Sequence, residues 1–128
     1  MNYKKLIIAL LWIGVVLFFL YQKGYILADF ESVYSDKAIH MVDDVNVTLL
    51  DVRTPQEYAQ QHIRGAILIP LSELNSRLHE LNKDKTVLIY CQTGNRSVTA
   101  SRKLTSEGYT VFNLSGGITS WSDRSLLQ

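Results

Sequence analysis

The sequence predicts an α/β domain with a central, mostly parallel sheet and helices on both faces, preceded by one apolar helix. Two observations predict the domain. Short apolar runs alternate with helical patterns from about Asp29 onward, and several of these runs are apolar almost throughout, as in strands buried on both faces. The helix in front is predicted by an uncharged run from Leu6 to Tyr21.

The apolar run reads LIIALLWIGVVLFFLY. As a helix it is about 24 Å long, slightly short of the ~30 Å hydrocarbon core, and snorkelling lysines at both ends make up the difference. A cleaved signal peptide has a similar composition, and Ala28 could end one, but bulky Ile26 stands where a small residue is preferred. We therefore expect a transmembrane helix or uncleaved signal anchor over residues 6–22, after a short basic N-terminus at residues 1–5.

The charges divide unevenly between this segment and the rest of the chain. Lys4, Lys5 and Lys23 are the only charged side chains before Asp29, whereas the remainder holds ten Lys and Arg against twelve Asp and Glu. An acidic balance of this kind provides no basic surface for nucleic acid. Because more lysines precede the apolar segment than follow it, the positive-inside tendency places the domain on the outer, extracytoplasmic face. We expect a single-pass membrane protein in which residues 23–29 link helix and domain.

The elements of the domain alternate along the chain. The predicted strands are residues 47–52, 66–69, 86–90 and 110–114. The predicted helices are a short one carrying Ala38, Ile39 and Val42, one from Pro55 to about Gln60, one opened by Ser72 with Leu74, Leu78 and Leu81 at helical spacing, one over residues 97–107 closed by Gly108, and a last short one containing Trp121. Right-handed crossovers then place helices on both faces, and the active site is expected at the carboxyl ends of the strands.

Cys91, the only cysteine, directly follows the predicted strand 86–90. The next residues, QTGNRS, would wrap around the sulfur with their N–H groups pointing inward, and Gly94 allows the loop to turn back. The helix behind the loop adds the positive end of its dipole, so the surrounding dipoles favour the thiolate over the thiol. One cysteine excludes an internal disulfide, a cysteine-rich metal site and a resolving thiol within the chain.

The segment YCQTGNRS resembles the active-site loop of the rhodanese family, in the short form with four residues between cysteine and arginine. LLDVRTPQEYAQQHIRGAILIP resembles the family's Asp-Val-Arg turn and its His-Ile-x-Gly-Ala stretch, although Gln61 stands where the family commonly has glycine. NLSGGITSW resembles the Gly-Gly-x-x-x-Trp segment that closes the domain. The likeness covers about residues 30–124, which leaves residues 125–128 as a tail.

The resemblance implies a rhodanese-like three-layer fold and a sulfurtransferase that works by double displacement. The Cys91 thiolate attacks the outer sulfur of thiosulfate or another small anionic donor, and a thiol or cyanide then removes the sulfur from the resulting persulfide. No metal and no cofactor is implied. The loop residues expected to bind the donor and the persulfide are Gln92, Thr93, Gly94, Asn95, Arg96 and Ser97.

Asp51 and Arg53 are candidate supporting residues with two interpretations. They could brace the catalytic loop, with Asp51 paired to an arginine such as Arg96, or Asp51 could cap the helix at Pro55 or the turn before it. Glu57 is expected to form an ion pair with Arg53 or Arg64. His62 is expected to be structural, because sulfur transfer to a stabilised thiolate needs no general base.

Two other functional classes are weighed against the sulfurtransferase. Dual-specificity phosphatases and arsenate reductases use a related loop with five residues between cysteine and arginine; the loop here has four and fits a single sulfur better than a tetrahedral oxyanion. A membrane-held persulfide carrier or a non-enzymatic docking module for a membrane protein is the other alternative. The sequence leaves the physiological donor and acceptor open.

Overall fold

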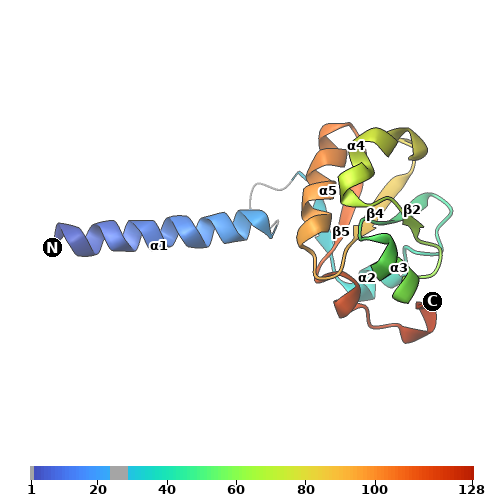
Figure 1. Cartoon of the computed structure of the whole chain (residues 1–128), viewed down its shortest axis with the longest axis horizontal. Helices are drawn as coiled ribbons and strands as arrows, with labels where there is room; N and C mark the ends of the chain where they lie inside the picture. Colours follow the sequence, from blue (N-terminus) through green and yellow to red (C-terminus); the bar gives the residue numbers. More distant parts are fainter. Residues whose placement is uncertain (1, 24–28) are drawn as a thin grey trace.

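The computed structural model describes residues 2–23 and 29–128. Helix α1 (Tyr3–Gln22) extends away from the domain, with the N-terminus at its far end (Figure 1). None of its residues is buried, and its length and composition suit both a membrane span and a signal sequence. Membrane insertion and the sidedness of the domain are therefore proposals. Most of the predicted linker, together with Ile26 and Ala28, lies outside the described residues.

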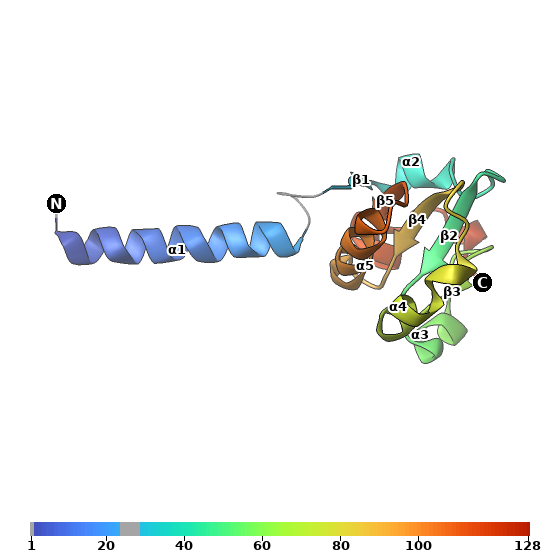
Figure 2. The same cartoon turned by 90° about the horizontal axis from the view of Figure 1, so that it is seen from above.

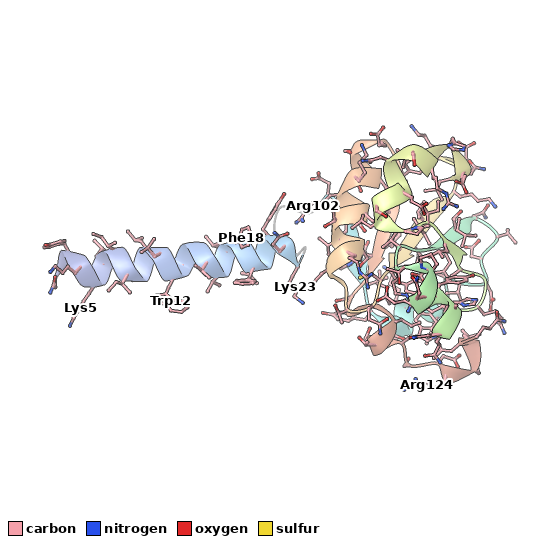
Figure 3. All side chains as sticks on the ribbon, in the orientation of Figure 1. Lys5, Trp12, Phe18, Lys23, Arg102 and Arg124 are labelled. Carbon is pink, nitrogen blue, oxygen red and sulfur yellow. The ribbon has the colours of Figure 1, made fainter. Side chains whose placement is uncertain are left out.

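The end of α1 lies beside helix α5 (Asn95–Ser106). The Arg102 guanidinium lies 3.9 Å from the centroid of the Tyr21 ring and donates a hydrogen bond to the Tyr21 carbonyl. Figure 3 shows Lys23 and Arg102 where α1 approaches the domain, whereas Lys5 and Trp12 project from the helix far from it. The outer end of the helix thus has no contact with the domain.

A five-stranded parallel sheet forms the centre of the domain, in the order β1-β5-β4-β2-β3. The strands are β1 (Glu31–Val33), β2 (Val47–Asp51), β3 (Ile67–Leu68), β4 (Thr86–Tyr90) and β5 (Val111–Leu114). The four predicted strands are present, some a residue or two shorter than expected. The fifth, β1, was missed because only one of its three residues is buried, so that its sequence carries no apolar run.

Strand β4 lies between β2 and β5, and its residues Val87 to Tyr90 are fully buried. This position explains its continuous apolar sequence, since both of its faces are covered. The register pairs Asp51 with Tyr90 and Asn113 with Ile89, so the polar ends of β2 and β5 flank the carboxyl end of β4.

Helices cover both faces of the sheet. The further elements are α2 (Ser35–Ile39), α3 (Pro55–Gln60), α4 (Leu74–Arg77) between the 3₁₀ turns η1 (Leu71–Glu73) and η2 (Leu78–Glu80), and the 3₁₀ turns η3 (Gly117–Ser120) and η4 (Arg124–Leu126). Leu74 of α4 and Leu104 of α5 belong to one apolar cluster, and Ala38 of α2 belongs to the other with Trp121. Accordingly, α2 lies on the opposite side of the sheet from α4 and α5 (Figure 2).

Several predicted elements differ from the structure. Helix α2 ends at Ile39, so Val42 lies beyond it, and α5 begins at Asn95, two residues before its predicted start. The helix expected from Ser72 is broken into η1, α4 and η2, because the backbone leaves the α conformation at Arg77 (φ −119°, ψ 12°), although Leu74 and Leu81 are buried as their spacing predicts. Trp121 follows the 3₁₀ turn η3 and is not part of a helix. The predicted tail is packed onto the domain, since Leu126 is buried and Gln128 exchanges two backbone hydrogen bonds with His62.

Candidate functional site

Cys91 lies immediately after β4 at the carboxyl edge of the sheet and is buried. The loop after β5 supports the backbone behind it, because the Ile118 N–H donates to the Cys91 carbonyl at 2.9 Å and the Thr119 N–H donates to the Gln92 carbonyl at 3.2 Å. A Cβ atom at Gly117 would lie 2.5 Å from both of these carbonyl oxygens. Glycine at this position therefore allows the two loops to pack directly against each other.

Two groups hydrogen-bond to the sulfur. The Gly94 N–H donates to Cys91 Sγ at 3.1 Å, and the Ser97 hydroxyl oxygen lies 3.5 Å from the sulfur. Gly94 has a φ of +102°, in the left-handed region, and helix α5 begins at the next residue. The sulfur thus faces a backbone donor, a hydroxyl and the positive end of a helix dipole. These groups suit an anionic sulfur, either a thiolate or a persulfide.

Arg96 is held by Glu57 of α3. Its two terminal nitrogens donate to the two carboxylate oxygens at 2.8 Å each, and the Thr54 N–H donates to the same carboxylate within a capping box that opens α3. The hydrogen bonds from Arg96, supported by those from Thr54, lower the pKa of Glu57 to about 2. The expected pairing of Glu57 with Arg53 or Arg64 is wrong, and Arg96 ties the catalytic loop to α3.

Arg53 connects the end of β2 to the catalytic loop. Its guanidinium donates to the Asp51 carboxylate from Nε at 3.0 Å and from Nη2 at 2.7 Å, and both side chains are buried. Nη1 donates to Gln92 Oε1 at 3.0 Å, and Nη2 also donates to the Gln61 carbonyl at 2.7 Å. The loop is therefore braced by Arg53, whose position is fixed by Asp51.

The predicted pairing of Asp51 with Arg96 is wrong, because the neighbouring Arg53 takes both carboxylate oxygens. The alternative interpretation holds in part: Asp51 Oδ1 accepts from the Arg53 N–H at 2.9 Å within the turn, whereas α3 is capped by Thr54. Burial, and then the charge of Asp51, raise the pKa of the Tyr90 phenol, whose oxygen accepts from the Ile63 N–H. The Tyr90 phenol, at the carboxyl end of β4, is therefore neutral.

His62 lies in a packed segment away from the sulfur's hydrogen-bond partners. Its Nδ1 is 2.9 Å from the Tyr58 carbonyl, and its ring stacks on the Tyr58 ring with 3.8 Å between centroids. This geometry fits the structural role expected for it. Among the residues that the structure describes, no group of three or more His, Cys, Asp or Glu side chains is placed to bind a metal ion.

Sequence reasoning missed two contributors to the site. The first is Glu57, whose spacing from Thr54 marks a capping box but does not reveal Arg96 as its partner. The second is the loop after β5, whose Ile118 and Thr119 amides hold the carbonyls of Cys91 and Gln92. The consecutive glycines at 116 and 117 were its signal, since two adjacent glycines indicate a backbone that approaches another closely.

Comparisons with known proteins show what the chain is similar to. The family model of the rhodanese-like domain matches residues 35–124. The chain is 41% identical over 87 residues to a sulfurtransferase of Allochromatium vinosum, covering 67% of this chain and 81% of that protein. It is 42% identical over 71 residues to the thiosulfate sulfurtransferase PspE of Escherichia coli, covering 54% and 68%. A crystal structure of a rhodanese-like domain protein from Staphylococcus aureus superposes with a TM-score of 0.69 at 31% identity, covering 76% and 96%.

Proposed function

The chain belongs to the rhodanese-like domain family, and we propose that it moves a sulfane sulfur from thiosulfate or a related anionic donor to a thiol or cyanide through a persulfide on Cys91. Its sulfurtransferase relatives support sulfur transfer as the general activity. The observation that carries the proposal is the hydrogen bond from the Gly94 N–H to Cys91 Sγ at the start of α5. That donor stabilises a negative charge on sulfur without any proton transfer.

In the first displacement the Cys91 thiolate attacks the outer sulfur of the donor. The new bond joins Sγ to that sulfur, and the bond between the two donor sulfurs breaks with its electron pair leaving on sulfite. The persulfide carries its negative charge on the outer sulfur, which lies one bond beyond Sγ and is surrounded by the catalytic loop. Gly94 and Ser97 keep their contacts with Cys91 Sγ, the sulfur to which they are hydrogen-bonded before the donor reacts.

In the second displacement an acceptor anion attacks the outer sulfur, and the electron pair of the persulfide bond returns to Sγ. Cys91 is the only cysteine, so the acceptor is an external molecule. The loop must keep its shape through both steps. Arg96 bound to Glu57 and Arg53 bound to Gln92 hold it at two points, and neither guanidinium needs to touch the reacting sulfur to do so.

A direct test is sulfur transfer from thiosulfate to cyanide by the full chain in detergent, with Cys91→Ala in parallel. Cys91-dependent turnover, together with a gain of one sulfur atom in the mass spectrum after exposure to thiosulfate, supports the proposal. Loading without turnover would indicate a carrier that needs a specific partner. Neither loading nor turnover, from thiosulfate or from polysulfide, would rule out the catalytic role and leave a docking module.

We further propose that α1 anchors the domain to a membrane, with the domain on the outer face. The support is the length and exposure of its apolar side chains and the lysines at its ends. Only seven residues lie between Lys23 and Glu31, so the two positions are eight residue steps apart and even a fully extended chain keeps the start of the domain within about 29 Å of the helix end. Alkaline extraction of membranes tests the anchor, and the mass of the mature protein distinguishes it from a cleaved signal sequence.

A further inference from the structure

A cavity of about 390 Å³ lies between the end of α1 and the domain. One wall is formed by residues of α1 close to its end and by Lys23, which follows it; the other is formed mainly by the first two turns of α5, where Asn95 and Thr99 line it. Figure 3 shows Phe18 and Lys23 on the part of α1 nearest to the domain. The volume lies within the ~300–1,000 Å³ of sites that bind small molecules.

The two walls are held together by the contact between Arg102 and Tyr21. The last turn of α1 contains no basic residue, although the carbonyls there carry the negative end of the helix dipole. Arg102 of α5 supplies a cation at this place: its guanidinium donates to the Tyr21 carbonyl and lies over the Tyr21 ring. The domain is thus attached to the end of α1 in a way that suits the polarity of the helix.

The α1 wall changes from apolar to polar along the helix. Phe18 and Phe19 are exposed, and both line the cavity together with Gln22 and Lys23. From Phe19 to Lys23 the helix rises about 6 Å. In a helix that spans a bilayer, residues at the end of the apolar run lie where hydrocarbon gives way to the headgroups. This wall therefore fits an amphiphile with an apolar chain beside the two rings and a polar head near Lys23.

The charges around the cavity define the head of such a ligand. Within residues 2–23 and 29–128, no acidic side chain lines the cavity. Arg96 also lines it, but Glu57 already compensates its charge. Lys23 is the cation that remains for a ligand, and the exposed Asn95 and Thr99 side chains offer hydrogen bonds beside it. The head that fits is therefore anionic.

We propose that this cavity binds the headgroup of an anionic phospholipid. The phosphate pairs with Lys23, and an acyl chain lies along Phe18 and Phe19. The inference rests on the proposed anchoring of α1 and goes beyond sulfur transfer, to which it adds no step. It gives the domain a lipid contact of its own, at the face where α5 meets the anchor.

The test measures lipid binding to the full chain in detergent by native mass spectrometry. Phosphatidylglycerol is compared with phosphatidylcholine of the same acyl chains and with soluble glycerol 3-phosphate. We expect the first phosphatidylglycerol to bind about fivefold more tightly than phosphatidylcholine, as for one lysine near an anionic lipid. Glycerol 3-phosphate lacks acyl chains and should not displace the lipid. Equal binding of the two lipids, or displacement by glycerol 3-phosphate at the lipid's own concentration, would overturn the inference.

Variants assign the binding to this cavity. Lys23→Gln should abolish the preference for phosphatidylglycerol. Lys5→Gln is the matched control, because Lys5 lies at the opposite end of the same helix, far from the domain, and it should leave the preference unchanged (Figure 3). Thr99→Trp fills the cavity from an exposed position and should weaken binding without removing a charge. A preference that survives Lys23→Gln, or binding that Thr99→Trp leaves intact, would place the lipid elsewhere and refute the site.

Failure of the anchor and failure of the lipid site give different results. Release of the chain from membranes by alkaline extraction refutes the anchor and the lipid site with it. Retention in the membrane without a preference for phosphatidylglycerol refutes the lipid site alone. Neither result bears on sulfur transfer, which is measured separately through sulfite release and the mass of the loaded chain.

Discussion

Arg96 and Glu57 face each other in a two-point ion pair, with both nitrogen–oxygen distances at 2.8 Å, across 39 residues of sequence. The pair joins the first turn of α5 to the first turn of α3. It therefore fixes the end of the catalytic loop to an element that lies outside the loop, and it explains why an arginine and not a lysine follows Gly-Asn.

Glu57→Gln should loosen the catalytic loop. The variant keeps the size of the side chain but removes the charge that Arg96 binds, and because both side chains are about one-third exposed we expect a loss of only about 1 kcal/mol in unfolding free energy. Sulfite release on loading should slow several-fold. Stopped-flow sulfite detection and urea unfolding measure the two effects. Glu73→Gln, which removes an exposed partner of Arg77, is the control and should change neither.

The same pair predicts a dependence of stability on pH. The pKa of Glu57 is lowered in the folded chain to about 2, from an ordinary value near 4.5, so its contribution is complete above about pH 4.5 and declines as the pH falls toward 2. Urea unfolding of the wild type and Glu57→Gln at pH 6, 4 and 3 should give a difference that shrinks with acidity. A difference that is constant over this range would contradict the pairing.

Asp51→Asn should be strongly destabilising, because it leaves the buried Arg53 guanidinium without its counter-charge. Removing one partner of a buried pair costs about 3–5 kcal/mol, which is a large share of the stability of a domain of this size. Asp43→Asn removes the partner of the exposed Arg64 and should cost less than about 0.5 kcal/mol. Similar losses for the two variants in urea unfolding would show that the Asp51–Arg53 pair is not important for folding.

Gly117→Ala should displace the catalytic loop. Its Cβ would lie 2.5 Å from the carbonyl oxygens of Cys91 and Gln92, in addition to the strain of about 1–2 kcal/mol that any Cβ meets at a φ of +64°. Gly65→Ala is a matched control, since Gly65 has a φ of +83° but no atom within 4 Å of a Cβ. We expect both to lose stability and only Gly117→Ala to lose most of its sulfur loading in the mass spectrum. Equal loading would show that the two loops adapt to each other.

The sequence predicted the elements whose signal is local. Strand β4 was recovered with its observed bounds because every residue from 87 to 90 is buried, and α3 was recovered because Pro55 marks its first position. The edge strand β1 and the break at Arg77 could not be predicted in this way. The first depends on pairing with β5, 81 residues away, and the second has no signal in the helical spacing of Leu74, Leu78 and Leu81, which continues across Arg77.

The candidate site shows the same division. Cys91 and its loop are consecutive in sequence, so the turn at Gly94 could be predicted, and Gly94 has a φ of +102°. Of the loop N–H groups expected to point at the sulfur, the described residues show a hydrogen bond to Sγ from Gly94 alone. The ion pairs were not predicted, because the sequence offers Asp51 several arginines as partners. Arg53 pairs with Asp51 within a tight turn two residues on, whereas Arg96 pairs with Glu57 of α3, 39 residues away in sequence, which only the fold brings close.

If Cys91 carries the sulfur, a single turnover of the enzyme should reveal it. Full-length chain is mixed with excess thiosulfate in the absence of any acceptor, and the sulfite released is counted against Cys91→Ser. We expect a burst of one sulfite per chain, a gain of one sulfur atom localised to the Cys91 peptide, and no burst in the variant. Sulfite release of equal size from Cys91→Ser, or a burst without added sulfur on the Cys91 peptide, would contradict it.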